Sequence, residues 1–478
     1  MRCGWRRPTL ALIAALAMLA AACSSSSAAP EPTDPPEPSP SVAEPSLAAP
    51  EGVVEANSGP VEEVTVDGIV DHLEALQAIA DEHGGTRVSG SPGYDASVRY
   101  VADVLRATGY EVGLVSTEVP VFELEGPTVF ERTSPDPQAW LDGVDFRSML
   151  FSPSGDVRGR VAFAGTGCSV SDFDGFPAGD VALVTPGDCF RRDQVRLAQG
   201  AEAAAVIGVG RTGTGAPLRP TLIYPEGLSV PAISVTSDLG AEIEEGWVVH
   251  IRVRASTHYE DVESVIADLP GGRGGVVMLG GHLDSALDGP GLNDNGSGTA
   301  LLLETARWLA AAQPETAVRF AFWAGEEEGL WGSWEYAHQL TSEQRDAIEV
   351  YINMDMIASP NFVTYVYESD PGVAVSDLVE RLFIETLDDA GAASEVLNLH
   401  GASDHAAFAD VGVATGGLYS GSQEIKTDEQ ARAFGGTAGE PLDACYHQPC
   451  DRLDRVSRTA LRVHLAAFVE VVSALLLT

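Results

Sequence analysis

The stretch VVMLGGHLDS, residues 276–285, contains an apolar run that leads directly into a histidine and an aspartate. The run 276–280 is apolar without alternation, which is typical of a strand covered on both faces. Downstream, strand and helix patterns alternate, with helices expected at 300–311 and 330–340 and strands at 318–323 and 350–357. This alternation predicts an α/β fold in which a mixed, twisted sheet is sandwiched by helices.

Upstream of this region, between residues 130 and 254, the pattern changes. Short β-type runs alternate with Gly/Pro turns there, and one helix-like stretch at 193–200 interrupts them. We therefore expect a compact, mainly-β insert at 130–254. The larger domain would then consist of an N-terminal part at 61–129 and a second part at 255–478.

The N-terminus has the features of an export signal. Residues 1–22 combine arginines with a short apolar run, which predicts a signal peptide. The run ends in LAAAC and is similar to a bacterial lipobox with Cys23 as the lipidated residue; plain secretion is the alternative. Residues 23–60 are rich in Ser, Pro, Ala and Glu and predict a flexible tether. We expect an exported protein, either a lipoprotein on the outer face of the cell membrane or a secreted one.

The C-terminal run 456–477 is apolar but contains charged side chains. It predicts a packing helix rather than a membrane span. The formal net charge of −42 argues against nucleic-acid binding through phosphate neutralisation. An acidic surface favours solubility without indicating a particular partner, and the sequence does not indicate an oligomeric state.

Four cysteines remain after the signal peptide and Cys23 are set aside: Cys168, Cys189, Cys445 and Cys450. An even number in an exported protein suggests two disulfides, most simply 168–189 and 445–450. Buried free thiols are the alternative. The spacing of these cysteines does not favour a cysteine-rich zinc site, because no CxxC pair occurs.

Two segments that follow the strand expected at 276–280 carry candidate metal ligands. His282 and Asp284 are two residues apart on an extended segment, so their side chains project to the same side. His282 can bind a metal while Asp284 accepts its other ring proton. Asp294 lies in GLNDNGSG, residues 291–298, where the flanking glycines allow close approach of the backbone to a site. Taken alone, His282 also suits a surface histidine and Asp294 a helix cap.

Three further segments supply acids and a second histidine. Glu326 and Glu327 follow a buried strand, so one carboxylate can bind a metal while its neighbour faces the substrate as a base; a solvated acidic turn is the alternative. Asp355 interrupts an apolar strand, where an unpaired carboxylate is costly and requires a cation or hydrogen-bond donors. His447 lies in CYHQPC, residues 445–450, where a short disulfide loop would hold it rigidly.

In order, these segments read His, Asp, Glu-Glu, Asp, His, a series that resembles the metal-binding series of the M28 peptidases. The chain is similar to the bacterial secreted zinc aminopeptidases of that family from about residue 261 to 477, with a weaker similarity at 64–110. The insert, with Cys168 and Cys189, resembles a protease-associated (PA) domain, which in the family usually shapes the substrate cleft. The resemblance implies a zinc exopeptidase fold with an inserted mainly-β PA domain.

The resemblance also implies two zinc ions and a role for each candidate residue. It assigns His282 and Asp355 to one ion, His447 and Glu327 to the other, and Asp294 to a bridge between them. It makes Glu326 the general base, Asp284 the supporting carboxylate and Tyr446 a residue that stabilises the oxyanion.

A pair of zinc ions roughly 3.5–4 Å apart can activate a shared water and polarise a scissile carbonyl. Glu326 would move the proton of that water to the leaving amine. The expected substrates are peptides, shortened from their N-termini.

Some residues depart from the family pattern. Ala402 stands where several aminopeptidases have arginine, and the acids of a family calcium site are not evident after Cys450, so we do not predict calcium. Asp404 and His405 are expected to support the site rather than bind metal. The alternatives are an M28-like carboxypeptidase, a glutaminyl cyclase that uses one metal, and an inactive surface-binding lipoprotein.

Overall fold

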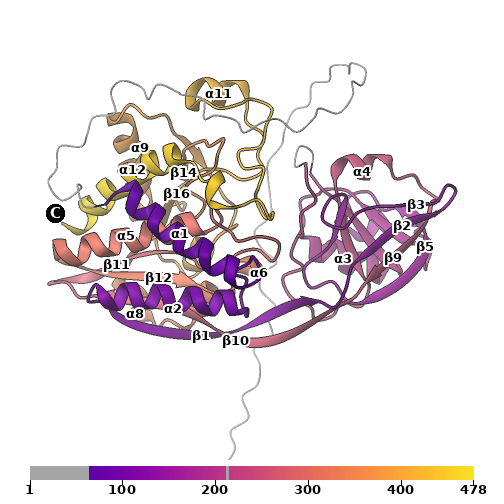
Figure 1. Cartoon of the computed structure of the whole chain (residues 1–478), viewed down its shortest axis with the longest axis horizontal. Coiled ribbons are helices and arrows are strands. Elements are labelled where there is room, and N and C mark those ends of the chain that lie inside the picture. The colour runs from indigo at the N-terminus through magenta and orange to yellow at the C-terminus, as the bar shows by residue number, and fades with distance from the viewer. Residues whose placement is uncertain (1–63, 212–214, 478) are drawn as a thin grey trace, which may run out of the picture.

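The computed structural model describes residues 64–211 and 215–477. These residues form two eight-stranded sheets, which lie in different parts of the molecule (Figure 1). The predicted signal peptide at 1–22, the predicted lipidation site Cys23 and the predicted tether to residue 60 all lie outside the described residues.

The larger sheet is mixed. Its four central strands run parallel to one another, while β10 and β14 run antiparallel to the central strands that they adjoin. In spatial order the sheet contains β1 (Glu111–Leu124), β10 (Ala255–Leu269), β12 (Thr316–Trp323), β11 (Arg273–His282), β13 (Ile348–Met354), β16 (Thr415–Tyr419), β14 (Tyr365–Tyr367) and β15 (Glu395–Leu397).

Alternate side chains of the central strands pack on opposite faces of this sheet. Val277 and Leu279 belong to one apolar cluster and Met278 to another, as the two-residue period of a strand requires. Helices cover both faces, which confirms the expected α/β class. The first cluster contains residues of α1 (Val66–Glu82), α2 (Pro92–Ala107), α5 (Gly296–Ala312), α9 (Ala374–Asp389) and α12 (Arg458–Leu476). The second contains residues of α7 (Trp331–Gln339) and α10 (His405–Asp410), and α8 (Ser342–Ala347) lies against β11 and β13.

Polar side chains define where the main helices begin. Thr65, Ser91, Asn295 and Ser457 each accept a hydrogen bond from a backbone N–H in the first turn of α1, α2, α5 and α12. Helix α12 is long and apolar enough to cross a membrane by length and composition. However, Leu461, Phe468 and Val472 on α12 are fully buried in the core of the larger sheet, as expected for a packing helix.

Several boundaries differ from the sequence prediction: β11 extends to His282, α5 begins at Gly296, and two further differences concern acids of the site. The strand expected at 350–357 ends at Met354, so Asp355 follows the strand instead of interrupting it. The acidic run after β12 forms a short helix, α6 (Glu326–Gly329), instead of a strand end. Both differences move acidic groups off the sheet and onto the loops at its edge, where carboxylates are easier to accommodate.

The second sheet is formed by the chain between β1 and β10. In spatial order it contains β3 (Gln138–Ala139), β2 (Val129–Ser134), β9 (Val248–Val253), β5 (Gly155–Phe163), β6 (Val181–Val184), β7 (Ala205–Val209), β8 (Ala232–Val235) and β4 (Phe146–Ser148). The helices α3 (Arg191–Gly200) and α4 (Ser237–Glu242) also belong to this segment. Figure 1 shows β1 and β10 as a long ribbon that joins the two parts of the molecule.

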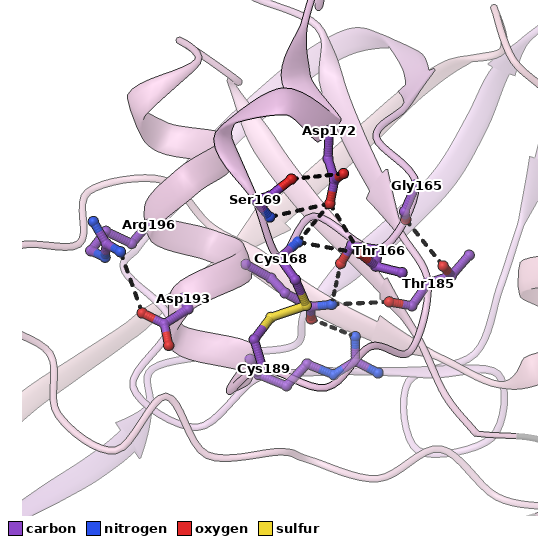
Figure 2. The surroundings of a disulfide bond; sticks show 11 residues. Gly165, Thr166, Cys168, Ser169, Asp172, Thr185, Cys189, Asp193 and Arg196 are labelled. Carbon is purple, nitrogen blue, oxygen red and sulfur yellow. Dashed lines mark hydrogen bonds and ion pairs between the residues drawn. A yellow bond between two sulfur atoms is a disulfide. The ribbon is translucent and has the colours of Figure 1, made fainter. Parts of the chain in front are cut away.

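The structure contains the disulfides Cys168–Cys189 and Cys445–Cys450, which is the simplest pairing of the four cysteines. Figure 2 shows the first of these beside the turn that follows β5. The carboxylate of Asp172 accepts hydrogen bonds there from the backbone N–H of Cys168 (2.9 Å) and the hydroxyl of Thr166 (3.0 Å). The disulfide therefore ties an ordered turn to the start of α3.

Replacing Cys168 and Cys189 together by serine is expected to lower the free energy of unfolding of the insert by about 3 kcal/mol. The two cysteines are 21 residues apart, so their bond removes considerable chain entropy from the unfolded state. Denaturant titration followed by circular dichroism measures the loss. The Cys445–Cys450 bond spans only 5 residues and provides the comparison. A loss no larger than that of the Cys445→Ser/Cys450→Ser variant would contradict the entropic argument.

Candidate metal centre

The five predicted ligands converge at the carboxyl ends of the parallel strands. His282 is the last residue of β11, and Asp355 directly follows β13. Asp294 immediately precedes Asn295, which caps α5. Glu327 lies on α6 after β12, and His447 lies in the loop closed by the disulfide Cys445–Cys450. Loops at this edge of an α/β sheet commonly form ligand sites because neighbouring strands deliver them to one place.

The carboxylate of Asp294 lies between the two imidazoles. Its Oδ1 is 3.1 Å from Nε2 of His282, and its Oδ2 is 3.0 Å from Nε2 of His447. Each imidazole nitrogen also faces a second carboxylate. Asp355 Oδ1 lies 3.3 Å from His282 Nε2, and Glu327 Oε2 lies 2.9 Å from His447 Nε2. The arrangement consists of two similar halves that share Asp294.

These residues fit a pair of zinc ions. Donor atoms about 2.0–2.1 Å from a tetrahedral zinc ion lie about 3.3 Å from one another, close to the four distances above. Nε2 of His282, Oδ1 of Asp355 and Oε1 of Glu327 are buried and have no hydrogen-bond partner within the described part of the chain. Donor atoms of His282, Asp294 and Glu327 all lie within 4.8 Å of one another. Nitrogen and carboxylate oxygen are the usual ligands of catalytic zinc.

The two halves differ in their access to solvent. The side chain of His282 is fully buried, whereas that of His447 is 21% exposed. The carboxylates rank the other way, since Asp355 is 12% exposed and Glu327 is 6% exposed, so the difference in access concerns the two histidines.

Asp284 orients both the histidine and the acidic loop. Nδ1 of His282 lies 3.1 Å from the main-chain oxygen of Asp284 and 3.7 Å from its carboxylate, so the carbonyl is the nearer partner of that nitrogen. The Asp284 carboxylate instead accepts hydrogen bonds from the backbone N–H groups of Glu326 (3.4 Å) and Glu327 (3.2 Å). Asp284 thus connects the end of β11 to the start of α6.

Glu326 and Tyr446 lie beside the predicted ligands without belonging to the two halves. Burial raises the pKa of the Glu326 carboxyl well above its usual value, and the carboxylates of Asp355 and Glu327 raise it further against the opposing effect of His282. The ring of Tyr446 stacks on that of His447 with centroids 3.8 Å apart. Burial, together with the carboxylates of Asp294 and Glu327, raises the pKa of Tyr446, so its hydroxyl is a proton donor at neutral pH.

Comparison with known proteins shows the family to which the chain belongs. Residues 264–472 match peptidase family M28, and residues 155–243 match the PA domain. An aminopeptidase of Pseudomonas aeruginosa is 36% identical over 86% of this chain and 81% of its own length. The protein described as probable lipoprotein aminopeptidase LpqL of Mycobacterium tuberculosis is 37% identical over 84% of this chain and 83% of its own length. The chain belongs to peptidase family M28.

Two solved aminopeptidase structures show the same fold. The aminopeptidase from Aneurinibacillus sp. strain AM-1 superimposes with a TM-score of 0.70 at 22% identity, covering 87% of this chain and 95% of that one. The zinc aminopeptidase BSAP of Bacillus subtilis gives a TM-score of 0.68 at 21% identity, covering 86% and 96%. The expected family, the expected fold and the expected PA-type insert are therefore confirmed.

This M28 site also depends on buried residues that sequence reasoning missed. Arg87 is fully buried, and its guanidinium donates to the carbonyl oxygens of Leu283, Pro290 (3.0 Å) and Gly291 (2.8 Å). It therefore organises the loop between His282 and Asp294. Nothing in the local sequence around Arg87 distinguishes it from a surface arginine.

One hydrogen-bond acceptor and one hydrogen-bond donor near the predicted ligands were also missed by the sequence analysis. The carboxylate of Asp451 accepts from the backbone N–H groups of Asn293 (2.8 Å) and Asp294 (3.1 Å). The hydroxyl of Ser403 donates to Oδ2 of Asp355 at 2.7 Å. Ser403 directly precedes Asp404 and His405, whose expected supporting role stays a prediction.

Proposed function

We propose that this protein is a two-zinc aminopeptidase that removes N-terminal residues from peptides. The observation that carries the proposal is the Asp294 carboxylate, whose two oxygens face separate imidazoles that each have a second carboxylate. The P. aeruginosa and M. tuberculosis relatives, both described as aminopeptidases, cover more than four-fifths of the chain and support the same activity.

Each residue of the centre has a distinct role in the proposed reaction. His282 and Asp355 would hold one ion, His447 and Glu327 would hold the other, and Asp294 would contribute to both. Zinc ions in such a pair polarise the substrate carbonyl and lower the pKa of a water molecule. Glu326 accepts the proton of the attacking water and delivers it to the leaving amine. The Tyr446 hydroxyl donates a hydrogen bond to the oxygen on which negative charge develops.

The charges around the centre favour a substrate amine over a substrate carboxylate. A carboxypeptidase needs a cationic side chain to bind the terminal carboxylate. The arginines that border the loop 283–291 have other partners: Arg87 binds carbonyl oxygens, and Arg147 and Arg219 bind Asp288. The surplus of carboxylates suits a protonated α-amino group, which argues for the aminopeptidase.

The site of action proposed for the enzyme is outside the cytoplasm. Two disulfides favour an oxidising compartment, and one relative is described as a probable lipoprotein. We propose attachment to the cell membrane through lipidated Cys23, with peptides as the substrates.

The test of the proposed function compares peptides that differ only at the N-terminus. Zinc-loaded protein is expected to release the first residue from a peptide with a free α-amine and to leave the N-acetylated peptide intact. Mass spectrometry of the products identifies which end is shortened. Release from the carboxyl end would instead support a carboxypeptidase, and ring formation on an N-terminal glutamine would support a cyclase. Intact peptides with fully zinc-loaded protein would support a binding protein.

A further inference from the structure

A buried ion-pair cluster joins the PA-type insert to the loop between two predicted ligands. Arg147 on β4 and Arg219 both contact the carboxylate of Asp288, which lies between His282 and Asp294 in the chain. Nε of Arg219 lies 2.9 Å from Oδ2 and its Nη2 lies 3.2 Å from Oδ1. The side chains of the two arginines are 7% and 6% exposed, so the cluster is shielded from solvent and weakly screened.

The same part of the insert reaches the loop that carries His447. Nη2 of Arg147 donates to Oε1 of Gln448 at 3.1 Å, and Nε2 of Gln448 donates to the carbonyl oxygen of Pro217 at 3.2 Å. Nε of Arg147 donates to that carbonyl as well, at 3.1 Å. Gln448 directly follows His447 and is buried. Its backbone also packs tightly on the Asp288 loop, since a Cβ added at Gly289 would lie 2.3 Å from the Gln448 carbonyl oxygen.

A third contact reaches the loop that carries Glu327. The hydroxyl of Thr221 donates to the carbonyl oxygen of Glu328 at 3.4 Å. The side chain of Ile223 packs against Gly329, where an added Cβ would meet it at 3.3 Å. The insert therefore contacts residues adjacent to both His447 and Glu327, in addition to the loop that leads to Asp294.

The other half is held by different groups. Asp355 is bound by Ser403, and the main-chain oxygen of His282 accepts from the hydroxyl of Thr299 at 3.0 Å. Within residues 64–211 and 215–477, no hydrogen bond or ion pair joins the insert to His282, Asp355, Thr299 or Ser403. The larger domain contributes to both halves, since Asp284 also binds the backbone N–H of Glu327, whereas the contacts of the insert lie only on the side of His447 and Glu327.

We propose that the insert sets the zinc affinity of the half formed by His447 and Glu327, with Arg147 and Arg219 acting as positioning residues through Asp288 and Gln448. The half formed by His282 and Asp355 binds zinc independently of the insert. This inference rests on the two-zinc function proposed above. It gives the insert a role in assembling the centre in addition to any effect on the shape of the cleft.

The test measures two zinc dissociation constants on metal-free full-length protein, by titration against a competing chelator. Asp288→Asn is expected to weaken one constant roughly 10–100-fold, the range typical for groups that orient metal ligands. The dissociation constant of the other zinc ion is expected to stay unchanged in Asp288→Asn. His447→Ala identifies the constant that belongs to the half with Glu327, and adding Asp288→Asn to that variant has no further effect on the remaining constant.

Two variants protect the test from a folding artefact. Asp288→Asn leaves two buried arginines without a carboxylate, so Arg147→Met/Arg219→Met/Asp288→Asn removes all three charges together and is expected to show the same selective weakening. Asp268→Asn is the matched control, because it breaks a comparable bidentate pair with Arg319 on the larger sheet and leaves both constants unchanged. Circular dichroism verifies that each variant is folded.

The outcomes separate this inference from the proposed function. Wild-type protein that binds fewer than two zinc ions would refute the two-zinc function itself. Two zinc ions in the wild type, with both constants unaffected or equally weakened in the Asp288→Asn and triple variants, would overturn only the role of the insert.

Discussion

Replacement of Glu326 by glutamine is expected to lower kcat by roughly 10²–10⁴-fold, the usual contribution of a positioned general base. Glutamine keeps the shape of the side chain but cannot accept the proton of the attacking water. Glu326 does not belong to either pair of predicted ligands, so the zinc content is expected to stay at the wild-type value. Steady-state kinetics on an amino-acid p-nitroanilide, with metal analysis of the same sample, measures both quantities.

The control for this experiment is Glu343→Gln, an equivalent change on the exposed first turn of α8. It is expected to leave kcat at the wild-type value. If Glu326→Gln retained full kcat with normal zinc content, Glu326 would have no part in proton transfer. If it lost zinc as well as activity, the carboxylate would be acting as a ligand.

Asp294→Ala is expected to have the largest effect of any single change at the centre. The two carboxylate oxygens face different imidazoles, so under the proposed two-zinc function the change removes a ligand from both ions at once. We expect both ions to be bound weakly and kcat/KM to fall on the order of 10⁴-fold or more. The residues of the centre act as a unit, so removing one shared member is expected to abolish most of the rate enhancement that they provide together. Metal analysis after gel filtration and assay at saturating zinc provide the two readouts.

Asp355→Ala is the comparison for Asp294→Ala, because Asp355 faces only His282. It is expected to weaken one ion and leave the other bound. If Asp294→Ala retained one tightly bound zinc ion, Asp294 would not be a shared ligand. Full activity with a single ion would favour the one-metal chemistry of a cyclase-type site.

The convergence of the predicted ligands at one sheet edge could be predicted from the sequence because strand ends are easy to locate. His282, Glu327 and Asp355 each follow an apolar run, and such runs in an alternating α/β pattern deliver their ends to one edge of a sheet. The strand prediction at 350–357 was wrong at its end, because the apolar residues Met356 and Ile357 continue the pattern beyond the end of β13 at Met354. Both side chains are buried, so these two residues are apolar because of their burial and not because they belong to a strand.

The supporting contacts could not be predicted because they join segments far apart in the chain. Arg87 is about two hundred residues from the carbonyl oxygens that it binds, and Arg147 is 301 residues from Gln448. The local sequence around each of these arginines has no pattern that distinguishes a buried partner from solvent. The carboxylate of Asp284 was also expected at His282, whereas backbone N–H groups of α6 compete for it successfully.

The ribbon formed by β1 and β10 has a consequence for how such an enzyme can change over time. Leu124 at the end of β1 pairs with Ala255 at the start of β10, so the chain leaves the catalytic body and returns to it at neighbouring points. A segment inserted between Leu124 and Ala255 does not need to alter the register in which β1 and β10 pair. The length of the insert can therefore change without altering the larger sheet, provided that the contacts of Arg147, Arg219 and Thr221 with the metal centre are kept.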